Sequence, residues 1–433
     1  MIYILLTAFI ILFILYFMVA QSFNSPVALL LLSFIMALSL IMANIDNWQV
    51  HIHEDLPVFI SLAVISFSFG CLISGIISEK VYSKSFVNES VYRIPEVSDK
   101  RMLVLFFLVP GVCTFAYLII SMKIGSVGDA GNNIFRNIYV NSAQTSSNFI
   151  FHQFREITVA TAEVSLISIF ANNYYYKKRF KLMTIVPLVC YVICTMLSTD
   201  RNIFLRFVIY ALSLWVFFIT ETSERSRAAT NRDVFRKAVI IVAISTGAFY
   251  LLGKLKSYTS NFERMIGIYG GSGLYNFNLT IDRFGDYSYE YGKVTFSQLI
   301  RTLGALGFNV ESYAGPSLGN EMIIGKSANG YVYASNIYSA MMPYISDFGT
   351  FGLILFPLIM GAFFGLLYSV AKAKKTEYLW GIYSLLIYAV VYFTITEQFF
   401  MRLHLGLFYE LFWFTVVFSL AFGRRRIADQ KWI

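Results

Sequence analysis

Apolar residues follow one another in long, nearly unbroken runs along most of the chain. A helix that crosses a bilayer needs roughly 17 to 25 such residues, because each residue adds only about 1.5 Å to its length. The expected fold is therefore an all-α polytopic membrane helical bundle, with residues 1–433 forming a single integral membrane domain. The pattern predicts eleven transmembrane helices, near residues 2–20, 27–45, 57–77, 102–122, 157–172, 183–199, 203–220, 238–253, 347–371, 378–398 and 404–423.

Two polar segments interrupt the apolar runs. The larger, residues 254–343, lies between the eighth and ninth predicted spans and combines charged residues with many tyrosines and glycine-rich turns. The smaller, residues 123–156, precedes the fifth span. Ordinary connections between helices are far shorter than the larger segment. We interpret that segment as the working surface of the protein.

Lys and Arg are concentrated in alternate loops. One set of loops, together with the C-terminal tail, holds 21 of the 34 basic residues. Loops that are rich in Lys and Arg face the cytoplasm in membrane proteins. The charge pattern therefore predicts an N-terminus outside the membrane, a C-terminus in the cytoplasm, and both polar segments on the extracytoplasmic side.

Composition excludes a soluble fold, because 57% of the residues are hydrophobic, only 14% are charged and the mean hydropathy is +0.64. The net charge of +9 sits largely in short loops, so we expect membrane lipids rather than nucleic acid as its partners. The four cysteines fall inside apolar runs without His or carboxylate neighbours, which predicts core thiols and no metal site. No nucleotide-binding loop or metal-dependent sugar-transfer motif is present, so an activated donor has to arrive already attached to a lipid.

Arginines at the outer ends of spans and in the larger polar segment are candidate phosphate-binding residues, because a guanidinium can donate two parallel hydrogen bonds to a phosphate. The candidates are Arg201 and Arg206 at the start of the seventh span and Arg264, Arg283 and Arg301 in the larger segment. The diphosphate group of a lipid is a ligand that these arginines could bind. Two alternatives stay open: Arg206 pairs with Glu163 and only fixes helix packing, or the segment's arginines are scattered charges on a solvated loop.

Charged residues at the mouths of the last spans are candidates for proton transfer. Asp347 stands at the entrance of the ninth span, Glu397 at the exit of the tenth, and Arg402 and His404 in the turn that follows. A base that takes a proton from a sugar hydroxyl would be an Asp, Glu or His. Each of these residues could equally be a helix cap or a partner for Arg402.

The string NIYSAMMPYISDFGTFGLILFPLIMGAFFGLLYSVAKAKK resembles the Wzy-type oligosaccharide repeat unit polymerases of bacterial O-antigen and capsule pathways. The segments STDRNIFLRFVIYALSLWVFF and IYGGSGLYNF extend the resemblance upstream. On these motifs, Arg201 matches the family's span-opening arginine and Asp347 matches its Asp-aromatic-Gly aspartate.

The resemblance implies a GT-C-like membrane glycosyltransferase that needs no metal or other cofactor. It would polymerise undecaprenyl-diphosphate-linked repeat units into O-antigen or capsular polysaccharide on the outer face of the bacterial cytoplasmic membrane. Flippase and chain-length regulator proteins would be its partners. Two rivals remain, an O-antigen ligase-type transferase and a flippase or exporter of lipid-linked glycans. The expected catalytic residues are Asp347, Glu397 and His404, and the expected substrate-binding residues are Arg201, Arg206, Arg264, Arg283, Arg301 and Arg402.

Overall fold

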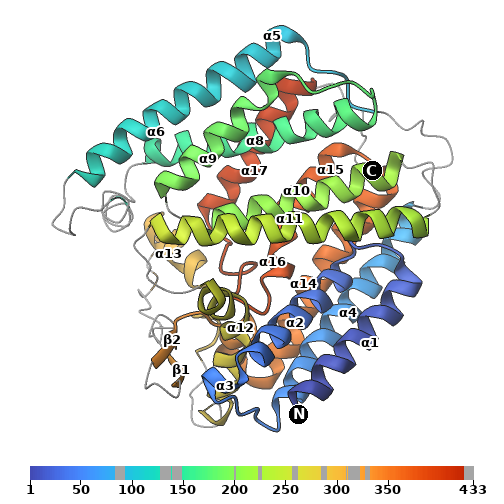
Figure 1. Ribbon diagram of the computed structural model, residues 1–433, viewed down its shortest axis with the longest axis vertical. Helices are drawn as coiled ribbons and strands as arrows, with labels where there is room; N and C mark the ends of the chain where they lie inside the picture. The colour runs from blue at the N-terminus through green and yellow to red at the C-terminus, as the bar shows by residue number, and fades with distance from the viewer. Residues whose placement is uncertain are drawn as a thin grey trace. The chain divides into compact units, whose positions relative to one another are not determined.

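The computed structural model describes residues 1–82, 93–126, 138, 149–198, 201–222, 227–255, 262–283, 290–308, 310, 322–326 and 332–423. Nearly all of these residues are helical, and one antiparallel pair of short strands, β1 and β2, lies within the larger polar segment. In chain order (Figure 1) the elements are α1 (Ile2–Ala20), α2 (Pro26–Ala43), α3 (Ile45–Trp48), α4 (Leu56–Tyr82), α5 (Asp99–Met102), the π-helix η1 (Leu103–Leu108), α6 (Val109–Gly125), α8 (Phe149–Tyr174), η2 (Leu182–Thr184), α9 (Val186–Ser198), α10 (Arg201–Thr222), α11 (Arg227–Leu255), α12 (Phe262–Thr280), η3 (Ile281–Arg283), α13 (Ser297–Ala305), β1 (Met322–Lys326), β2 (Val332–Ser335), α14 (Met341–Lys374), α15 (Glu377–Leu386), α16 (Tyr388–Val391) and α17 (Leu405–Phe422).

The chain is a multi-pass membrane protein. Within the described residues, eight helical segments are long and apolar enough to cross a bilayer: Ile2–Ala20, Pro26–Ala43, Leu56–Lys80, Asp99–Gly125, Arg201–Thr222, Ala229–Leu251, Met341–Lys374 and Leu405–Phe422. The predicted count of eleven is not confirmed. The spans expected near 183–199 and 378–398 are the shorter apolar helices Leu182–Ser198 and Glu377–Val391, and the one near 157–172 is α8, which is long but more polar.

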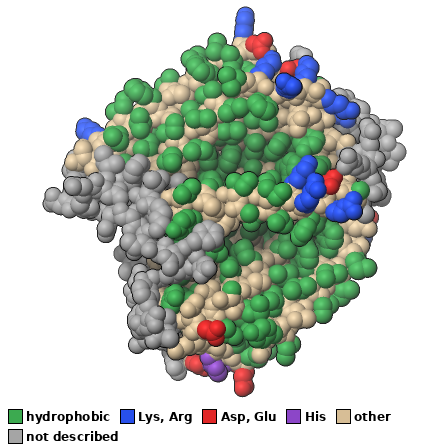
Figure 2. Space-filling model, viewed as in Figure 1, with side chains coloured by type: hydrophobic (Ala, Val, Ile, Leu, Met, Phe, Trp, Pro, Cys, Tyr) green, Lys and Arg blue, Asp and Glu red, His purple; other side chains and the backbone are tan. Residues whose placement is uncertain are grey.

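The chain divides into two compact units. Unit 1 comprises Met1–Glu89, Ser260–Lys374 and Leu386–Leu405, and unit 2 comprises Ser90–Thr259, Lys375–Leu385 and Gly406–Ile433. Each unit therefore draws on several separate stretches of chain. In unit 1, Figure 2 shows hydrophobic side chains spread over α1, α2 and α4, as contact with lipid requires.

Unit 1 is built around the packing of α4 against α14, which lie side by side (Figure 1). Small residues bring the two backbones together, as they do in many membrane helix pairs. A Cβ atom at Gly361 would lie 2.0 Å from the carbonyl oxygen of Phe67, and one at Gly70 would lie 2.2 Å from that of Leu358. The Cys71 thiol donates to the Gly361 carbonyl oxygen at 3.2 Å. This close contact fixes α14, the helix on which the first candidate site is built.

The larger polar segment contributes a buried helix, α12, that packs on α2 within unit 1. The ring of Tyr275 stacks on that of Trp48 with 5.7 Å between centroids, and its hydroxyl accepts a hydrogen bond from the His51 amide at 3.2 Å. The Asn278 side chain donates to the His51 carbonyl and accepts from the His53 amide. The segment is thus partly integrated into the helical core and is more than a surface loop.

In unit 2, α6, α8, α9 and α10 pack against one another. Tyr117 stacks on Phe151 with 4.6 Å between ring centroids, in a cluster with Cys194 and Leu197. The four cysteines are free thiols, three of them buried, as expected from their apolar surroundings. The buried hydroxyl of Tyr210 on α10 donates to the backbone carbonyl of Glu163 on α8 at 3.0 Å. These contacts set the positions of the charged side chains on α8 and α10.

Candidate active site

The ninth predicted span begins with a kink. In α14 the backbone leaves helical geometry at Phe348 (φ −139°, ψ 15°) and Gly349 (φ 58°, ψ −151°). Essentially only glycine adopts the second of these conformations. A Cβ atom at Gly352 would lie 2.1 Å from the carbonyl oxygen of Tyr344, so the turn after the kink also requires a glycine. The glycines of the DFGTFG string are therefore explained by backbone geometry.

Asp347 precedes the kink and is fully buried. Its Oδ1 accepts a hydrogen bond from the Val294 amide at 3.1 Å, and its Oδ2 accepts one from the Thr295 amide at 2.6 Å. Its backbone carbonyl accepts a third from the Tyr291 amide at 3.2 Å. A buried carboxylate needs such donors to offset its desolvation. Asp347 thereby holds the segment before α13 against the kink.

Glu397 organises a second loop, between α16 and α17. It is 2% exposed, and its Oε2 accepts a hydrogen bond from the Met401 amide at 2.6 Å. Its Oε1 accepts from the Phe399 and Phe400 amides and from the Tyr344 hydroxyl, each at 2.9 Å. The loop thus folds around the carboxylate, and Tyr344 connects it to α14.

Aromatic rings fill the space between these loops. Phe296 meets Phe356 and Phe400 edge-on, with ring centroids 5.8 and 5.6 Å apart. Tyr344 stacks on Phe356 at 5.0 Å. Such pairs add to the stabilisation from burial alone. Two carboxylates and an aromatic cluster therefore assemble three segments, residues 290–296, 341–352 and 394–402, which we call the kink assembly.

Replacing Gly349 by alanine should strain the kink by about 1–3 kcal/mol, because an L-residue rarely adopts its conformation. We expect the purified protein to unfold at a lower temperature than the parent. Gly247→Ala on α11 is the matched control, since a Cβ atom there meets nothing within 4 Å. Equal unfolding temperatures for the two variants would show that the kink is not required for stability.

Arg402 and His404 lie at the end of the second loop and are both half-buried. The Arg402 guanidinium donates to the Tyr388 hydroxyl at 2.7 Å and lies over the Tyr388 ring, 5.5 Å from its centroid. The His404 amide donates to the Arg402 carbonyl at 2.7 Å. Both side chains are more accessible than those of Asp347 and Glu397.

The three arginines predicted in the larger polar segment are spread over different elements of unit 1. Arg301 lies on α13 and is exposed. Arg264 lies in α12 and Arg283 in η3, but their side chains fall outside the described part of the structure. Their predicted roles in substrate binding stay predictions.

In unit 2, Arg201 is the first residue of α10 and is only 5% exposed. Its guanidinium carbon lies 5.4 Å from the centroid of the Phe249 ring on α11, close enough for a cation–π interaction. A buried arginine at the end of a span is costly unless it has partners or a task. The predicted role of Arg201 in substrate binding stays a prediction.

Arg206 lies one turn further along α10, and its guanidinium forms an ion pair with the Glu410 carboxylate on α17. The two side chains are 17% and 6% exposed, so both charges are largely desolvated. Sequence reasoning considered Glu163 as the partner of Arg206 and missed Glu410. The sequence does contain a signal for this partner, because Glu410 is a carboxylate inside an otherwise apolar span and needs a partner there.

The start of α8 contributes further polar groups to unit 2. Arg155 and Glu156 form an ion pair at 2.6 Å, and the Gln153 side-chain oxygen accepts a hydrogen bond from the Trp413 indole of α17 at 2.6 Å. Burial lowers the pKa of His152, and the charge of Arg155 lowers it further. Unit 2 thus gathers arginines, carboxylates and a weakly basic imidazole on α8, α10 and α17.

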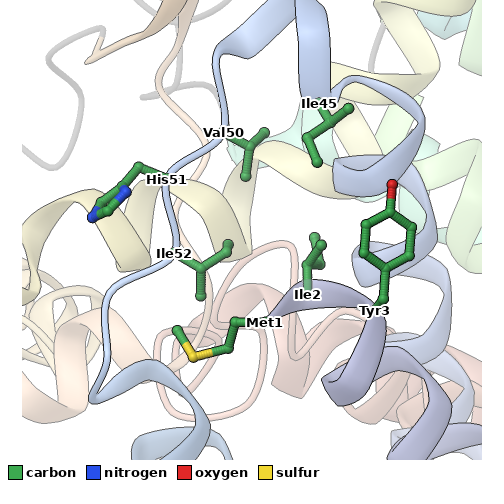
Figure 3. Close-up of a pocket in the computed structure, with 7 residues that line it drawn as sticks. All are labelled: Met1, Ile2, Tyr3, Ile45, Val50, His51 and Ile52. Atoms are coloured by element: carbon green, nitrogen blue, oxygen red, sulfur yellow. The ribbon is translucent and has the colours of Figure 1, made fainter.

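An apolar pocket of about 270 Å³ lies elsewhere in unit 1, between the start of α1 and the loop after α3. Figure 3 shows Ile2, Ile45, Val50 and Ile52 around one space, whereas the His51 ring points away from it. The residues that line the pocket are mostly apolar, and they include no carboxylate. Across the described residues, no group of three or more His, Cys, Asp or Glu side chains is arranged to hold a metal ion.

Residues 291–396 match a family model described as "Putative O-antigen polymerase". This match confirms the resemblance that the sequence motifs indicated. The matched range begins at Tyr291, contains the Asp347 kink and ends next to Glu397, so it covers most of the kink assembly. No curated protein matches the chain, and no solved structure matches it.

Proposed function

We propose, from the O-antigen polymerase match over residues 291–396, that this chain polymerises lipid-linked oligosaccharide repeat units into O-antigen or capsular polysaccharide. That match carries the proposal, because it falls on the kink assembly of a multi-pass membrane protein. The family points to polymerisation of O-antigen as the activity. We further propose undecaprenyl diphosphate as the carrier lipid, and the outer face of the bacterial cytoplasmic membrane as the location.

In the proposed reaction a sugar hydroxyl of one lipid-linked repeat unit attacks the anomeric carbon of a glycan held on another lipid diphosphate. A new C–O glycosidic bond forms as the C–O bond to the diphosphate breaks. The diphosphate leaves with the bonding electron pair, and the hydroxyl proton passes to a base. The protein has to stabilise the charge that develops on the diphosphate and to accept that proton.

Positive charge for the diphosphate would come from arginine, with Arg201 as the first candidate. Its burial supports this role, because a guanidinium in a low-dielectric site acts strongly on developing charge. Arg206 would act together with Glu410, which compensates its charge in the absence of substrate. Arg402 and the arginines of the larger polar segment, Arg264, Arg283 and Arg301, are the remaining proposed ligands.

Three residues are candidates for the base. Asp347 and Glu397 are buried, and every oxygen of their carboxylates accepts a hydrogen bond from the surrounding loops, so both are engaged in the fold and poorly accessible to a substrate hydroxyl. His404 is half-buried and lies on the same loop as Glu397. We therefore favour His404 as the base and regard Asp347 and Glu397 as positioning residues for the kink assembly.

Deleting the gene tests the proposal in the cell. The surface glycan should shrink to a single repeat unit per acceptor, because attachment continues while polymerisation stops. An O-antigen ligase would instead leave long glycan on the carrier lipid, unattached to its acceptor. Loss of a flippase or exporter would keep the repeat units on the cytoplasmic side. If the strain without the gene kept the glycan lengths of the parent strain, the proposal would be contradicted.

A further inference from the structure

Helix α13 is amphipathic, and Leu299, Ile300 and Leu303 within it are only half-buried. Leu299, Leu303 and Leu306 are spaced one turn apart, and 100° per residue places them on one side of the helix with Arg301 on the other. None of the side chains of α13 itself is buried. Beyond its end, Leu306 is 60% exposed and Phe308 is 61% exposed. Water is a poor solvent for such a stripe.

The position of α13 along unit 1 is fixed at its start. The amides of Val294 and Thr295 are held by the Asp347 carboxylate, and the Phe296 ring packs into the aromatic cluster. The helix begins at the next residue, Ser297. It therefore starts at the kinked end of α14, with no free linker between the anchored segment and its first turn.

The kinked end of α14 marks where lipid-exposed surface begins. Phe351, just after the kink, is 61% exposed, and Ile354, one turn further, is 38% exposed. Large apolar side chains on the outside of a membrane span face acyl chains. Helix α13 therefore follows directly from a segment that is held beside the first exposed apolar residues of α14.

We propose that α13 lies in the plane of the membrane–water interface. The Leu299, Leu303 and Leu306 stripe, with Phe308, enters the acyl boundary, and Arg301 lies among the lipid phosphate groups. Two observations favour the lipid bilayer as the partner of this apolar face. The segment that leads into α13 is anchored at Asp347, a few residues before the first exposed apolar side chain of α14, and an exposed arginine opposite the stripe complements anionic headgroups.

This placement has a consequence for the kink assembly. The carboxylate of Asp347 holds the segment that leads into α13, so the assembly lies at the depth of the lipid phosphates. A diphosphate carried by a lipid has its charge at that same depth. The inference about α13 stands on the helix itself and does not require the chain to be a polymerase.

Spin labels measure this depth. Leu303→Cys, Leu306→Cys and Arg301→Cys are labelled in the full-length protein, reconstituted in phospholipid nanodiscs, and their collision rates with oxygen and with a water-soluble nickel chelate are compared. Ile4→Cys on α1, where Ile4 is 75% exposed, gives the lipid reference, and Glu54→Cys, at an exposed position, gives the aqueous reference. The parent, labelled identically, gives the contribution of the native cysteines.

The labels at Leu303 and Leu306 should collide several-fold more with oxygen than with nickel, as at Ile4, and the label at Arg301 should resemble that at Glu54. High nickel accessibility at all three α13 positions would place the helix in water and overturn the proposal. Low accessibility to both reagents would mean that protein covers the stripe, which also overturns it. If a label disturbs folding, Phe308→Trp with brominated lipids supplies the same measurement, with extra quenching over the parent expected.

Discussion

Arg201→Ala is expected to abolish long polymer and to slow repeat addition by about 100- to 1,000-fold, while a single-repeat product still forms. Loss of one preorganised donor to developing charge has an effect of this size. The buried position of Arg201 means that solvent cannot replace the guanidinium. The measurement is the ladder of glycan lengths in cells that carry the variant, with the rate of repeat addition measured on purified protein.

Two further variants make this result specific. Arg201→Lys retains the positive charge but cannot form bidentate hydrogen bonds as a guanidinium does, so we expect an activity between those of the parent and Arg201→Ala. Arg232→Ala removes an exposed arginine from α11 and should leave the ladder unchanged. A parent-like ladder from a folded Arg201→Ala protein would remove Arg201 from the proposed site.

Glu410→Ala is expected to destabilise the protein by about 3–5 kcal/mol, because it leaves the Arg206 charge without its carboxylate partner in a buried position. Replacing both residues with apolar ones, Arg206→Met with Glu410→Leu, should restore most of the lost stability. Thermal unfolding of the purified variants measures both effects. A Glu410→Ala protein as stable as the parent would mean that the pair contributes little.

The double variant also separates two roles of Arg206. If Arg206 only joins α10 to α17, the stable double variant should still make long polymer. If Arg206 also binds the diphosphate, as we propose, that variant should fold and yet produce only single repeats. The comparison is valid once the double variant unfolds at a temperature close to that of the parent.

The membrane architecture could be predicted because hydropathy is local. Each of the eleven expected spans overlaps a helix, although the one near 378–398 is helical only as far as Val391, and within the described residues only eight helices satisfy length and composition together. The α12 helix could not be predicted by this criterion. Its close approach to α2 depends on small residues such as Gly270 and Gly271, which lie against Leu40. Its polar residues Ser272 and Asn276 have hydrogen-bond partners at Ser335 and Ile337, about sixty residues away in the chain.

The positions of Asp347 and Glu397 near helix ends could be predicted from the sequence, but their hydrogen-bond partners could not. Asp347 and Glu397 stand where expected, at the mouths of spans, but their partners lie in backbone amides that carry no sequence signal. Asp347 binds amides more than fifty residues earlier in the chain. The Arg206–Glu410 pair could not be predicted because the two residues lie about two hundred positions apart, on helices whose packing no local pattern specifies.

The most direct test of the account is to supply the purified protein, in proteoliposomes, with the single lipid-linked repeat units that accumulate in cells lacking the gene. We predict a ladder of products with two, three and more repeats, and release of one lipid diphosphate for each glycosidic bond formed. The account would be contradicted if the repeats stay single, or if they cross the bilayer unchanged.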